Sequence, residues 1–415
     1  MQNRQTVYIV VALVVGGLVG GACHIGIGDA ATRADLADYS TIVTDIFLRL
    51  VKMLIAPLVF ATLVTGLARM GQTKAIGRIG LRSMVWFIGA SIVSLLLGLF
   101  MVNLLQPGTG LTLSLPDPSV SSAVHGSELN LREFVTHLVP RSVVEAMAGN
   151  EILQIVVFSL FFGTAVAALG AKAKPVADFA EAAAHVMLEM TGYVMRAAPL
   201  AVFAAVAAVV AVQGLGILEI YGVFVGGFLA SLLLLWVILF AACFLVIGPR
   251  AGSLFRGIRV PLLLAFSTAS SEAAYPQTLE RLERFGASNR VISLVLPLGY
   301  SFNLDGSTMY CAFATMFIAQ AYGIPLSWEQ QLSMLLVLMV TSKGMAGVPR
   351  GSLVVIAVTL PMFHIPEAGL VLILGVDHFL DMGRSATNVV GNSIAAVVVA
   401  KWEGELAASA DPQKI

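Results

Sequence analysis

The sequence has few charged residues, few cysteines and no continuous block of basic residues. Charged residues make up 12% of the 415 residues, and 24 Lys and Arg balance 24 Asp and Glu. This balance excludes a basic nucleic-acid-binding surface. The three cysteines lie in apolar stretches and cannot all pair, so we expect small core residues and neither disulfides nor a metal site. These cysteines are Cys23, Cys243 and Cys311. We also expect no cofactor.

Apolar residues dominate what remains. They make up 58% of the chain, and the mean hydropathy is +0.91, far outside the range of soluble domains. We therefore predict an all-α polytopic membrane protein with the lipid bilayer as its surroundings. Eight transmembrane helices are expected, near residues 7–28, 41–69, 77–105, 150–170, 176–213, 216–248, 289–323 and 365–402.

Basic residues predict the orientation of these spans. They cluster in alternate connections, whereas the loops near 29–40, 214–217, 322–330 and 364–368 contain only one basic residue, Arg33. By the positive-inside rule both termini are cytoplasmic, and the polar segment 106–140 is an external loop. The cytoplasmic set is Arg69, Lys74, Arg78, Arg82, Lys172, Lys174, Arg250, Arg256 and Arg259. In the first span, Gly16/Gly20 and Gly17/Gly21 would let another helix approach closely.

Two further segments are apolar but too interrupted to span. Residues 253–284 have two half-length arms around a tip of Ser, Thr and Glu, with basic residues at both outer ends. Residues 327–364 repeat this pattern without basic flanks, so their ends should point the opposite way. A span interrupted by polar residues follows each one, at 300–308 and at 371–402. We predict two re-entrant hairpins in inverted repeats, the construction of secondary transporters with a midplane site.

A polar stripe crosses the last span. Asp377, Asp381, Arg384 and Asn388 are spaced at i, i+4, i+7 and i+11, and Asn392 extends the row by another helical turn. Charges at this depth cost several kcal/mol and normally face a protein interior or a water-filled path. The stripe indicates a functional site, although a structural ion pair between Arg384 and the aspartates is the alternative.

The residue types of the stripe indicate the ligand. Arg384 has the fixed fork of donors that binds a carboxylate, and Asp381 one turn earlier suits an ammonium group. Asp377 is placed to orient Arg384. Together they predict a zwitterion with an extra carboxylate, which is glutamate or aspartate.

Other polar residues surround this pair in the predicted fold. Ser270, Ser271 and Ser307 offer neutral donors, although serines at a tip also permit tight backbone packing. Asn303 and Asp305 offer oxygens for a cation in a broken helix. Glu272 is either a hydrogen-bonding residue or a proton carrier.

These motifs resemble the glutamate transporter family, the dicarboxylate/amino acid:cation symporters, and within it the bacterial proton/glutamate-aspartate symporters. The segment RLVKMLIAPLVF at 49–60 is similar to the second helix of that family, so the resemblance covers nearly the whole chain. The C-terminal motifs are Ser270-Ser271 with Pro276, Asn303 to Ser307, Ala346 to Pro349, and Asp381 to Arg384 with Asn388.

The resemblance implies a homotrimer with an elevator mechanism. Residues 1–70 and 106–213 would form a static scaffold, and 77–105 with 216–415 a moving transport domain. Arg384 would bind the side-chain carboxylate, Asp381 the amino group and Asn388 the α-carboxylate, with Val348 and Ser385 also lining the substrate. The second hairpin, 341–352, would be the gate. Relatives that carry dicarboxylates lack an acid at the Asp381 position, which favours an amino acid here.

The chain departs from the sodium-coupled members at their cation sites. Asn392 stands where they have an aspartate, and Leu304, Ala90 and Met345 replace other family residues. Fewer oxygen ligands weaken sodium binding, so we infer proton coupling. The glutamate that carries the proton in animal members corresponds to Cys311, which leaves Glu272, Asp305 and Asp381 as candidates. The degenerate cation-site positions are Gly299, Asn303, Asp305, Ser342, Lys343, Asn388 and Asn392.

Lys343 has two interpretations. Its ammonium group either replaces one bound sodium or snorkels toward the outer surface, and we favour snorkelling.

Other functional classes fit the sequence less well. Asp377 and Asp381 would be an unusual protease dyad because both lie on one helix, and no nucleophile motif surrounds Ser271. We therefore expect that the protein is not an enzyme. A channel is disfavoured because paired hairpins indicate an occluding carrier. Sodium-coupled uptake and C4-dicarboxylate uptake remain alternatives to proton-coupled glutamate or aspartate uptake across a bacterial cytoplasmic membrane.

Overall fold

The computed structural model describes residues 2–68, 73–109, 136, 139–214, 221–342, 351–374 and 376–407. Regular structure within these ranges is helical, and one isolated antiparallel bridge joins Ala287 to Leu406. The predicted all-α class is therefore confirmed. Lys343, Val348 and the motif 346–349 lie outside the described residues, as does most of the predicted external loop.

Four helical segments within the described ranges are long and apolar enough to cross a bilayer. They are Val7–Gly26, Ile76–Leu105, Gln154–Val194 and Gly222–Ile247. Shorter apolar helices accompany them at Met53–Ala68, Ala198–Val212, Arg259–Thr268 and Gly351–Met362. Helices satisfy their own backbone polar groups, which a bilayer interior demands.

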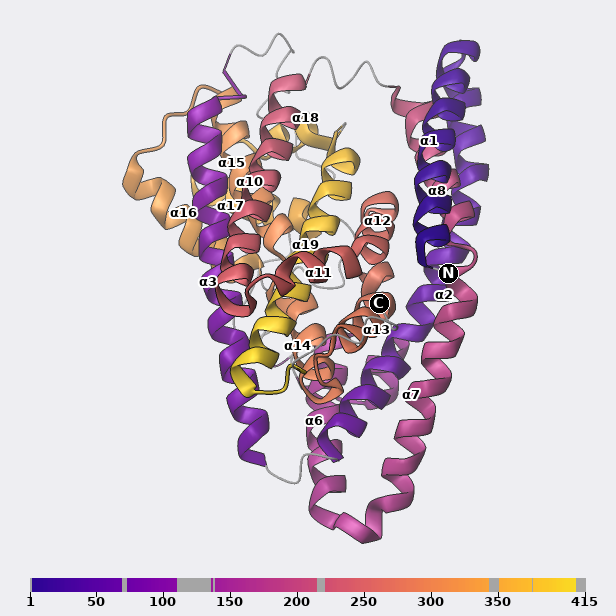
Figure 1. The fold of residues 1–415 in the computed structure, drawn as a ribbon. Helices are drawn as coiled ribbons and strands as arrows, with labels where there is room; N and C mark the ends of the chain where they lie inside the picture. The colour runs from indigo at the N-terminus through magenta and orange to yellow at the C-terminus, as the bar shows by residue number, and fades with distance from the viewer. Residues whose placement is uncertain are drawn as a thin grey trace.

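One group of helices comes mainly from the N-terminal half (Figure 1). Helix α1 (Gln2–Gly26) packs on α8 (Ala198–Gln213), and α2 (Ala30–Ala68) packs on α6 (Ile152–Leu169), α7 (Lys174–Met195) and α8. The short α5 (Val143–Ala148) and η1 (Gly170–Ala173) flank α6.

Close packing of α1 on α8 depends on two glycines. A Cβ at Gly16 would lie 2.7 Å from the carbonyl oxygen of Phe203, and one at Gly20 would lie 2.6 Å from that of Ala207. The predicted close approach is confirmed for this pair. A Cβ at Gly17 or Gly21 would meet no atom within 4 Å.

Two helix boundaries in this group differ from the expected spans. Helix α2 begins eleven residues before 41, because the polar stretch after Gly28 continues the helix. The span expected over 176–213 is interrupted at Arg196–Ala197. Pro199, in the first turn of α8, lacks the amide hydrogen that would continue α7.

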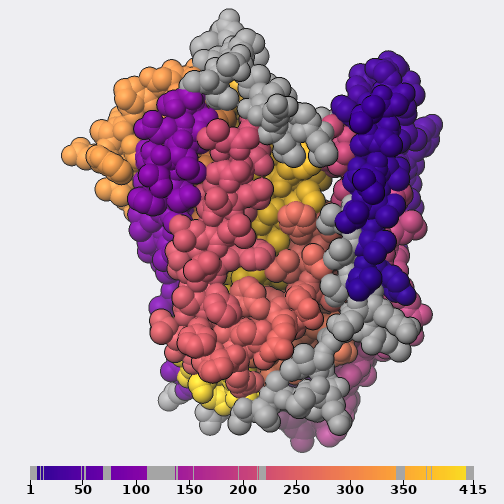
Figure 2. Space-filling view, turned by 45° about the horizontal axis from the view of Figure 1, so that its top comes forward, coloured from indigo at the N-terminus to yellow at the C-terminus, as the bar shows by residue number. Residues whose placement is uncertain are grey.

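The second group surrounds α19 (Asp377–Glu403), whose residues 382–400 are all buried. Helix α3 (Thr73–Leu105) and α10 (Gly222–Ile247) lie on one side, and Figure 2 shows α10 to α13 covering the face between α3 and α1. The other members are α11 (Arg250–Gly257), α12 (Arg259–Thr268), η2 (Glu272–Ala274), α13 (Tyr275–Phe285), α14 (Asn289–Phe302), α15 (Asp305–Ala321), α16 (Trp328–Thr341), α17 (Gly351–Met362), η4 (Glu367–Gly369) and α18 (Leu370–Leu374).

The half-length arms predicted in the C-terminal half are present. Helix α12 ends at Thr268, Ala269 adopts a left-handed conformation with φ of 49°, and α13 begins six residues later. Helices α14 and α15 are separated at Asn303–Leu304, where the sequence predicted a broken helix. Pairs of short helices followed by a divided helix therefore occur twice, as α12–α15 and as α16–α19. The polar stripe itself lies on unbroken helix in α19.

A short C-terminal strap, defined as residues 403–407, closes one end of the second group. Gly404, with φ of 72°, ends α19, and the amide of Glu405 donates back to the Ala400 carbonyl at 2.8 Å. The strap then pairs with the α13–α14 turn. The Ser288 amide donates to the Glu405 carbonyl at 3.1 Å, and the Ala407 amide donates to that of Gly286 at 2.9 Å.

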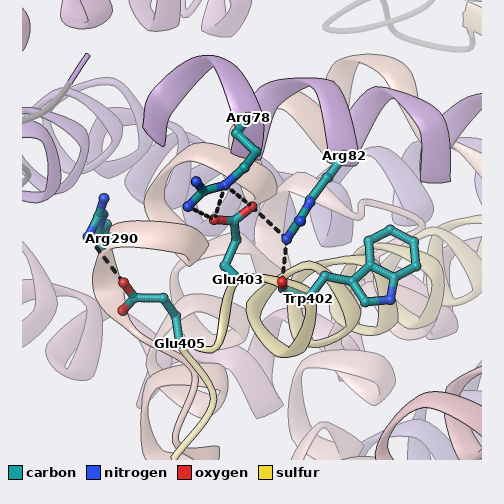
Figure 3. A network of polar contacts seen from close by, with 6 residues as sticks. All are labelled: Arg78, Arg82, Arg290, Trp402, Glu403 and Glu405. Carbon is teal, nitrogen blue, oxygen red and sulfur yellow. Dashed lines mark hydrogen bonds and ion pairs between the residues drawn. The ribbon is translucent and has the colours of Figure 1, made fainter. Parts of the chain in front are cut away.

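Side chains reinforce the strap (Figure 3). Arg78 Nη2 and Arg82 Nη1 of α3 lie 2.6 and 2.9 Å from the carboxylate of Glu403, and Arg82 also donates to the Trp402 carbonyl. Arg290 pairs with Glu405 at 3.1 Å. Arg250 donates to the Ala407 carbonyl at 2.7 Å. The strap thus joins α3, α11, the α13–α14 turn and α19.

Candidate functional site

Arg384 is the centre of the candidate site. Its side chain is only 1% exposed, and Nη2 lies 3.1 Å from Asp377 Oδ1 and 3.0 Å from Asp381 Oδ1. Nε donates to the same Asp381 oxygen at 3.2 Å. One cation therefore faces two carboxylates, as the i, i+4, i+7 spacing predicted. Nη1 is buried and has no hydrogen-bond partner among the described residues, so one side of the guanidinium is still available to a ligand.

The two aspartates differ in their surroundings. Asp377 is 1% exposed, whereas the side chain of Asp381 is 27% exposed. Asp377 begins α19 and pairs with Arg384 from its buried side, where it can orient the guanidinium. Asp381 keeps an open side, where a ligand group can approach.

The aromatic ring of Tyr310 in α15 lies against the face of the Arg384 guanidinium. The Arg384 Cζ lies 4.0 Å from the centroid of its ring, which is a cation–π contact. Tyr310 is fully buried, and the ring of Phe228 in α10 meets it edge-on at 5.2 Å. Sequence reasoning missed Tyr310, although its place five residues after Asp305 put it one helical turn beyond the NLDGS motif.

Asn388 binds the N-terminus of α15. Its Oδ1 accepts from the amides of Gly306 at 2.9 Å and Ser307 at 3.4 Å, and its Nδ2 donates to Ser307 Oγ at 3.1 Å. The predicted site residues Ser307 and Asn388 are thus brought together and bound to each other. The contact also holds α15 in register with α19, one turn beyond Arg384.

A second polar cluster lies between α14, α15 and α19. Asn303 Nδ2 donates to Asp305 Oδ2 and to Asn392 Oδ1, both at 3.2 Å. All three residues are buried. Two glycines make room for them: a Cβ at Gly299 would lie 2.3 Å from Asn392 Oδ1, and one at Gly391 would lie 2.0 Å from Asp305 Oδ2. Four of the predicted cation-site positions, Gly299, Asn303, Asp305 and Asn392, therefore converge.

This cluster contains amide N–H donors as well as oxygens, whereas a cation site is lined by oxygens. Asn303 uses its amide nitrogen to bridge Asp305 and Asn392, and its Oδ1 has no hydrogen-bond partner among the described residues. The same holds for Nδ2 of Asn392, which is a donor. A donor at this position competes with a metal cation for the surrounding oxygens.

The remaining predicted residues lie at the ends of short helices. Ser270 Oγ accepts from the Ala273 amide at 3.3 Å, which forms a turn at the tip between α12 and α13. Ser271 and Glu272 follow and are half-buried. Ser342 at the end of α16 is buried and donates to the Met339 carbonyl at 3.3 Å, and Ser385 beside Arg384 is buried. Among the described residues, no recorded hydrogen bond joins Ser270 or Ser271 to the stripe.

Comparison with known proteins identifies relatives over nearly the whole chain. The model of the sodium:dicarboxylate symporter family matches residues 6–402. The C4-dicarboxylate transport protein of Bacillus subtilis is 39% identical over 97% of this chain and 94% of its own length. The proton/sodium-glutamate symport protein of Geobacillus stearothermophilus is also 39% identical, over 96% of this chain and 94% of its own. The C4-dicarboxylate transport protein of Anaeromyxobacter sp. (strain K) is 38% identical over 96% and 89%.

These matches confirm the resemblance given by the sequence motifs. They extend from α1 through α19 and include the helices that carry the Arg384 cluster and the Asn303 cluster. The chain belongs to the sodium:dicarboxylate symporter family, a family of membrane transporters.

Proposed function

We propose that this protein is a symporter that takes up glutamate or aspartate together with protons. The observation that carries the proposal is the pairing of Arg384 with Asp381 in one buried cluster, with Nη1 of the arginine unpartnered among the described residues. Arg384 binds the side-chain carboxylate of the substrate, and the open side of Asp381 binds its ammonium group.

Charge balance in the cluster supports an amino acid substrate. Asp377 and Asp381 supply two carboxyl groups against the single guanidinium of Arg384. A buried surplus carboxylate is unfavourable until a cation or a proton joins it. The ammonium group of glutamate or aspartate supplies a positive charge beside Asp381, whereas a dicarboxylate has two carboxylates and no such group.

Proton coupling is supported by the Asn303 cluster. Asn392 offers one amide oxygen, already bonded to Asn303, and a donor in place of a second oxygen. A site of this composition binds sodium less well than one with another carboxylate. Glu272, Asp305 and Asp381 are the carboxyl groups proposed to carry the proton, with Gly299, Ser342, Lys343 and Asn388 as the other degenerate cation-site positions.

The proposed movement follows the two groups of helices. Helices α1, α2, α6, α7 and α8 form the static scaffold of a homotrimer, and the group around α19 moves as the transport domain. Val348 and Ser385 line the substrate, with Ser270 and Ser271 at the first hairpin tip, and residues 341–352 form the gate. The protein lies in the bacterial cytoplasmic membrane with both termini inside, and it catalyses no reaction.

Uptake by purified protein in liposomes tests this function. With an inward pH gradient and no sodium, we expect labelled glutamate or aspartate to accumulate and unlabelled succinate to compete poorly. Collapsing the pH gradient should stop accumulation. Strict dependence on sodium would refute the coupling ion, and accumulation of succinate without glutamate or aspartate would refute the substrate.

C4-dicarboxylate uptake is the second candidate. It is favoured by the names of two of the relatives and by the existing bond between Asp381 and Arg384 at 3.0 Å, which lets the aspartate act as a structural partner of the arginine. The Asp381→Asn variant distinguishes the two candidates, because a structural role predicts loss of every substrate and an ammonium-binding role predicts selective loss of amino acids.

A further inference from the structure

Helix α10 meets α19 directly behind Arg384. A Cβ at Gly383 would lie 2.9 Å from Leu232 and 3.3 Å from Leu229, so α10 occupies the space that a larger residue would fill. On the other side, a Cβ at Gly306 would lie 2.6 Å from the Arg384 carbonyl and 2.9 Å from Thr387 Cβ. The backbone of 383–387 is therefore held between α10 and the start of α15.

One polar contact fixes this arrangement. Trp236 of α10 donates through Nε1 to Thr387 Oγ1 at 2.8 Å, and that hydroxyl donates to the Gly383 carbonyl at 2.9 Å. Thr387 is fully buried. The chain of bonds runs from the indole to the peptide that precedes Arg384.

Beyond the packing of its leucines and phenylalanines, α10 offers few polar groups that could set its register. Its sequence is apolar except for Ser231, Trp236 and Cys243, and Ser231 Oγ donates to the Gly227 carbonyl within its own helix. In a bilayer, lipid is as apolar as leucine, so packing and interhelical hydrogen bonds determine how two helices associate. An interhelical hydrogen bond is directional and fixes the position of one helix along the other.

Helix α10 also contacts the aromatic ring that lies against the Arg384 guanidinium. Phe228, two turns before Trp236, touches the ring of Tyr310 edge-on, and that ring lies 4.0 Å under Arg384. Helix α10 therefore contacts both the backbone that carries Arg384 and the ring beneath its side chain.

We propose that Trp236 is a positioning residue that sets where Arg384 meets the substrate, and thereby the discrimination between glutamate and aspartate. This inference rests on the proposed function. Glutamate and aspartate differ by one methylene, so the position of the carboxylate-binding group relative to Asp381 decides which fits better. A small movement of Arg384 changes the two KM values unequally.

Uptake kinetics of paired variants test the role of Trp236. Trp236→Phe keeps the aromatic packing but removes the donor, and Thr387→Val removes the acceptor at nearly constant volume. Each should change the ratio of KM for glutamate to KM for aspartate by about threefold or more, the scale of one interhelical hydrogen bond in a membrane. The double variant should change it no further, and Thr387→Ser should restore the wild-type ratio.

Two matched controls show whether the effect is specific. Trp328 is 69% exposed on α16, and the hydroxyl of Thr315, fully buried in α15, donates to the Cys311 carbonyl of its own helix at 2.7 Å. Trp328→Phe and Thr315→Val should leave the ratio unchanged.

Several results would overturn the inference. It fails if Trp236→Phe and Thr387→Val leave the KM ratio as in the controls, if their effects add independently, or if they lower only Vmax per folded transporter. The amount of folded protein is measured by size-exclusion chromatography for every variant, and Thr387→Ser keeps the test valid if Thr387→Val does not fold. The wild-type substrate profile is measured first, so a wrong proposed function appears there and not in the variants.

Discussion

Helix α19 carries two clusters of arginine and carboxylate with opposite composition. Near its start, one arginine faces two aspartates, and Arg384 and Asp377 are each 1% exposed. At its end, two arginines face one glutamate: Glu403 is 2% exposed, but Arg78 and Arg82 are 56% and 37% exposed. The strap cluster therefore has one more arginine than carboxyl group, and its arginines reach solvent, whereas the Arg384 cluster has one more carboxyl group than arginine and is largely enclosed.

The difference shows which cluster is complete. Exposed arginines beside a carboxylate are satisfied by water, so the strap cluster needs no further partner. A buried surplus of negative charge is not satisfied in this way and favours uptake of a cation or a proton. The same pair of residue types thus makes a structural contact at one end of the helix and, in our proposal, a ligand site at the other.

Removing the single cation of the buried cluster should have the largest effect. Arg384→Ala leaves two buried aspartates without their partner, and truncation of one member of a buried charge pair costs about 2–5 kcal/mol. Uptake of anionic substrates should fall by about a hundredfold or more. Initial rates in liposomes, normalised to folded protein, measure this. Wild-type rates for glutamate or aspartate in this variant would contradict the site.

Neutralising Asp381 should be nearly as damaging, and selectively so. Asp381→Asn keeps the size of the side chain but removes the charge that binds an ammonium group. Uptake of glutamate and aspartate should be abolished, as measured in the same assay beside succinate. Unchanged glutamate uptake would eliminate the amino-acid assignment.

Adding a carboxylate to the Asn303 cluster should give it two acidic residues, as in the Arg384 cluster. Asn392→Asp places a second acid in the cluster of Asp305 and removes Nδ2 of Asn392, a donor that has no partner among the described residues. We expect uptake by this variant to be stimulated by sodium, compared with no stimulation of the wild type. Uptake at fixed pH with sodium or choline measures the change, and equal responses of the two proteins would argue against proton coupling through this site.

Neutralising the strap should give the smallest effect, and on stability more than on uptake. Glu403→Gln weakens the contact of α19 with Arg78 and Arg82, and charged hydrogen bonds contribute about 1.5–3 kcal/mol when well shielded. Exposure of both arginines lowers this value. The melting temperature in detergent should fall, with KM unchanged. Glu280→Gln is the control, because the side chain of Glu280 is 35% exposed where that of Glu403 is 2% exposed; an equal fall in the two variants would show that the strap has no special role.

Sequence patterns predicted the local features of the site well. The spacing of the stripe placed Asp377, Asp381 and Arg384 on one face, and the Asn-Leu-Asp-Gly run predicted the break between α14 and α15. Both depend on residues within a few turns of one another. The interruption before α8 also had a local signal in Pro199, which the apolar composition of 176–213 concealed.

Contacts between distant segments had no comparable signal. Arg78 and Glu403 are 325 residues apart, and Trp236 and Thr387 are 151 apart. The sequence of an apolar helix does not show which neighbouring helix its single tryptophan contacts. Asn388 was predicted to bind substrate, and the structure adds that its amide binds the N-terminus of α15.

The strap also imposes an order on the making of the protein. Its residues leave the ribosome after every helix that it joins, so α3, α11 and the α13–α14 turn must wait for α19 before the contacts of Figure 3 can form. Until then Arg78 and Arg82 lack Glu403, and the turn at Gly286 lacks its backbone partner. The contacts of the strap therefore join α3, α11 and the α13–α14 turn to α19 only after α19 has been made.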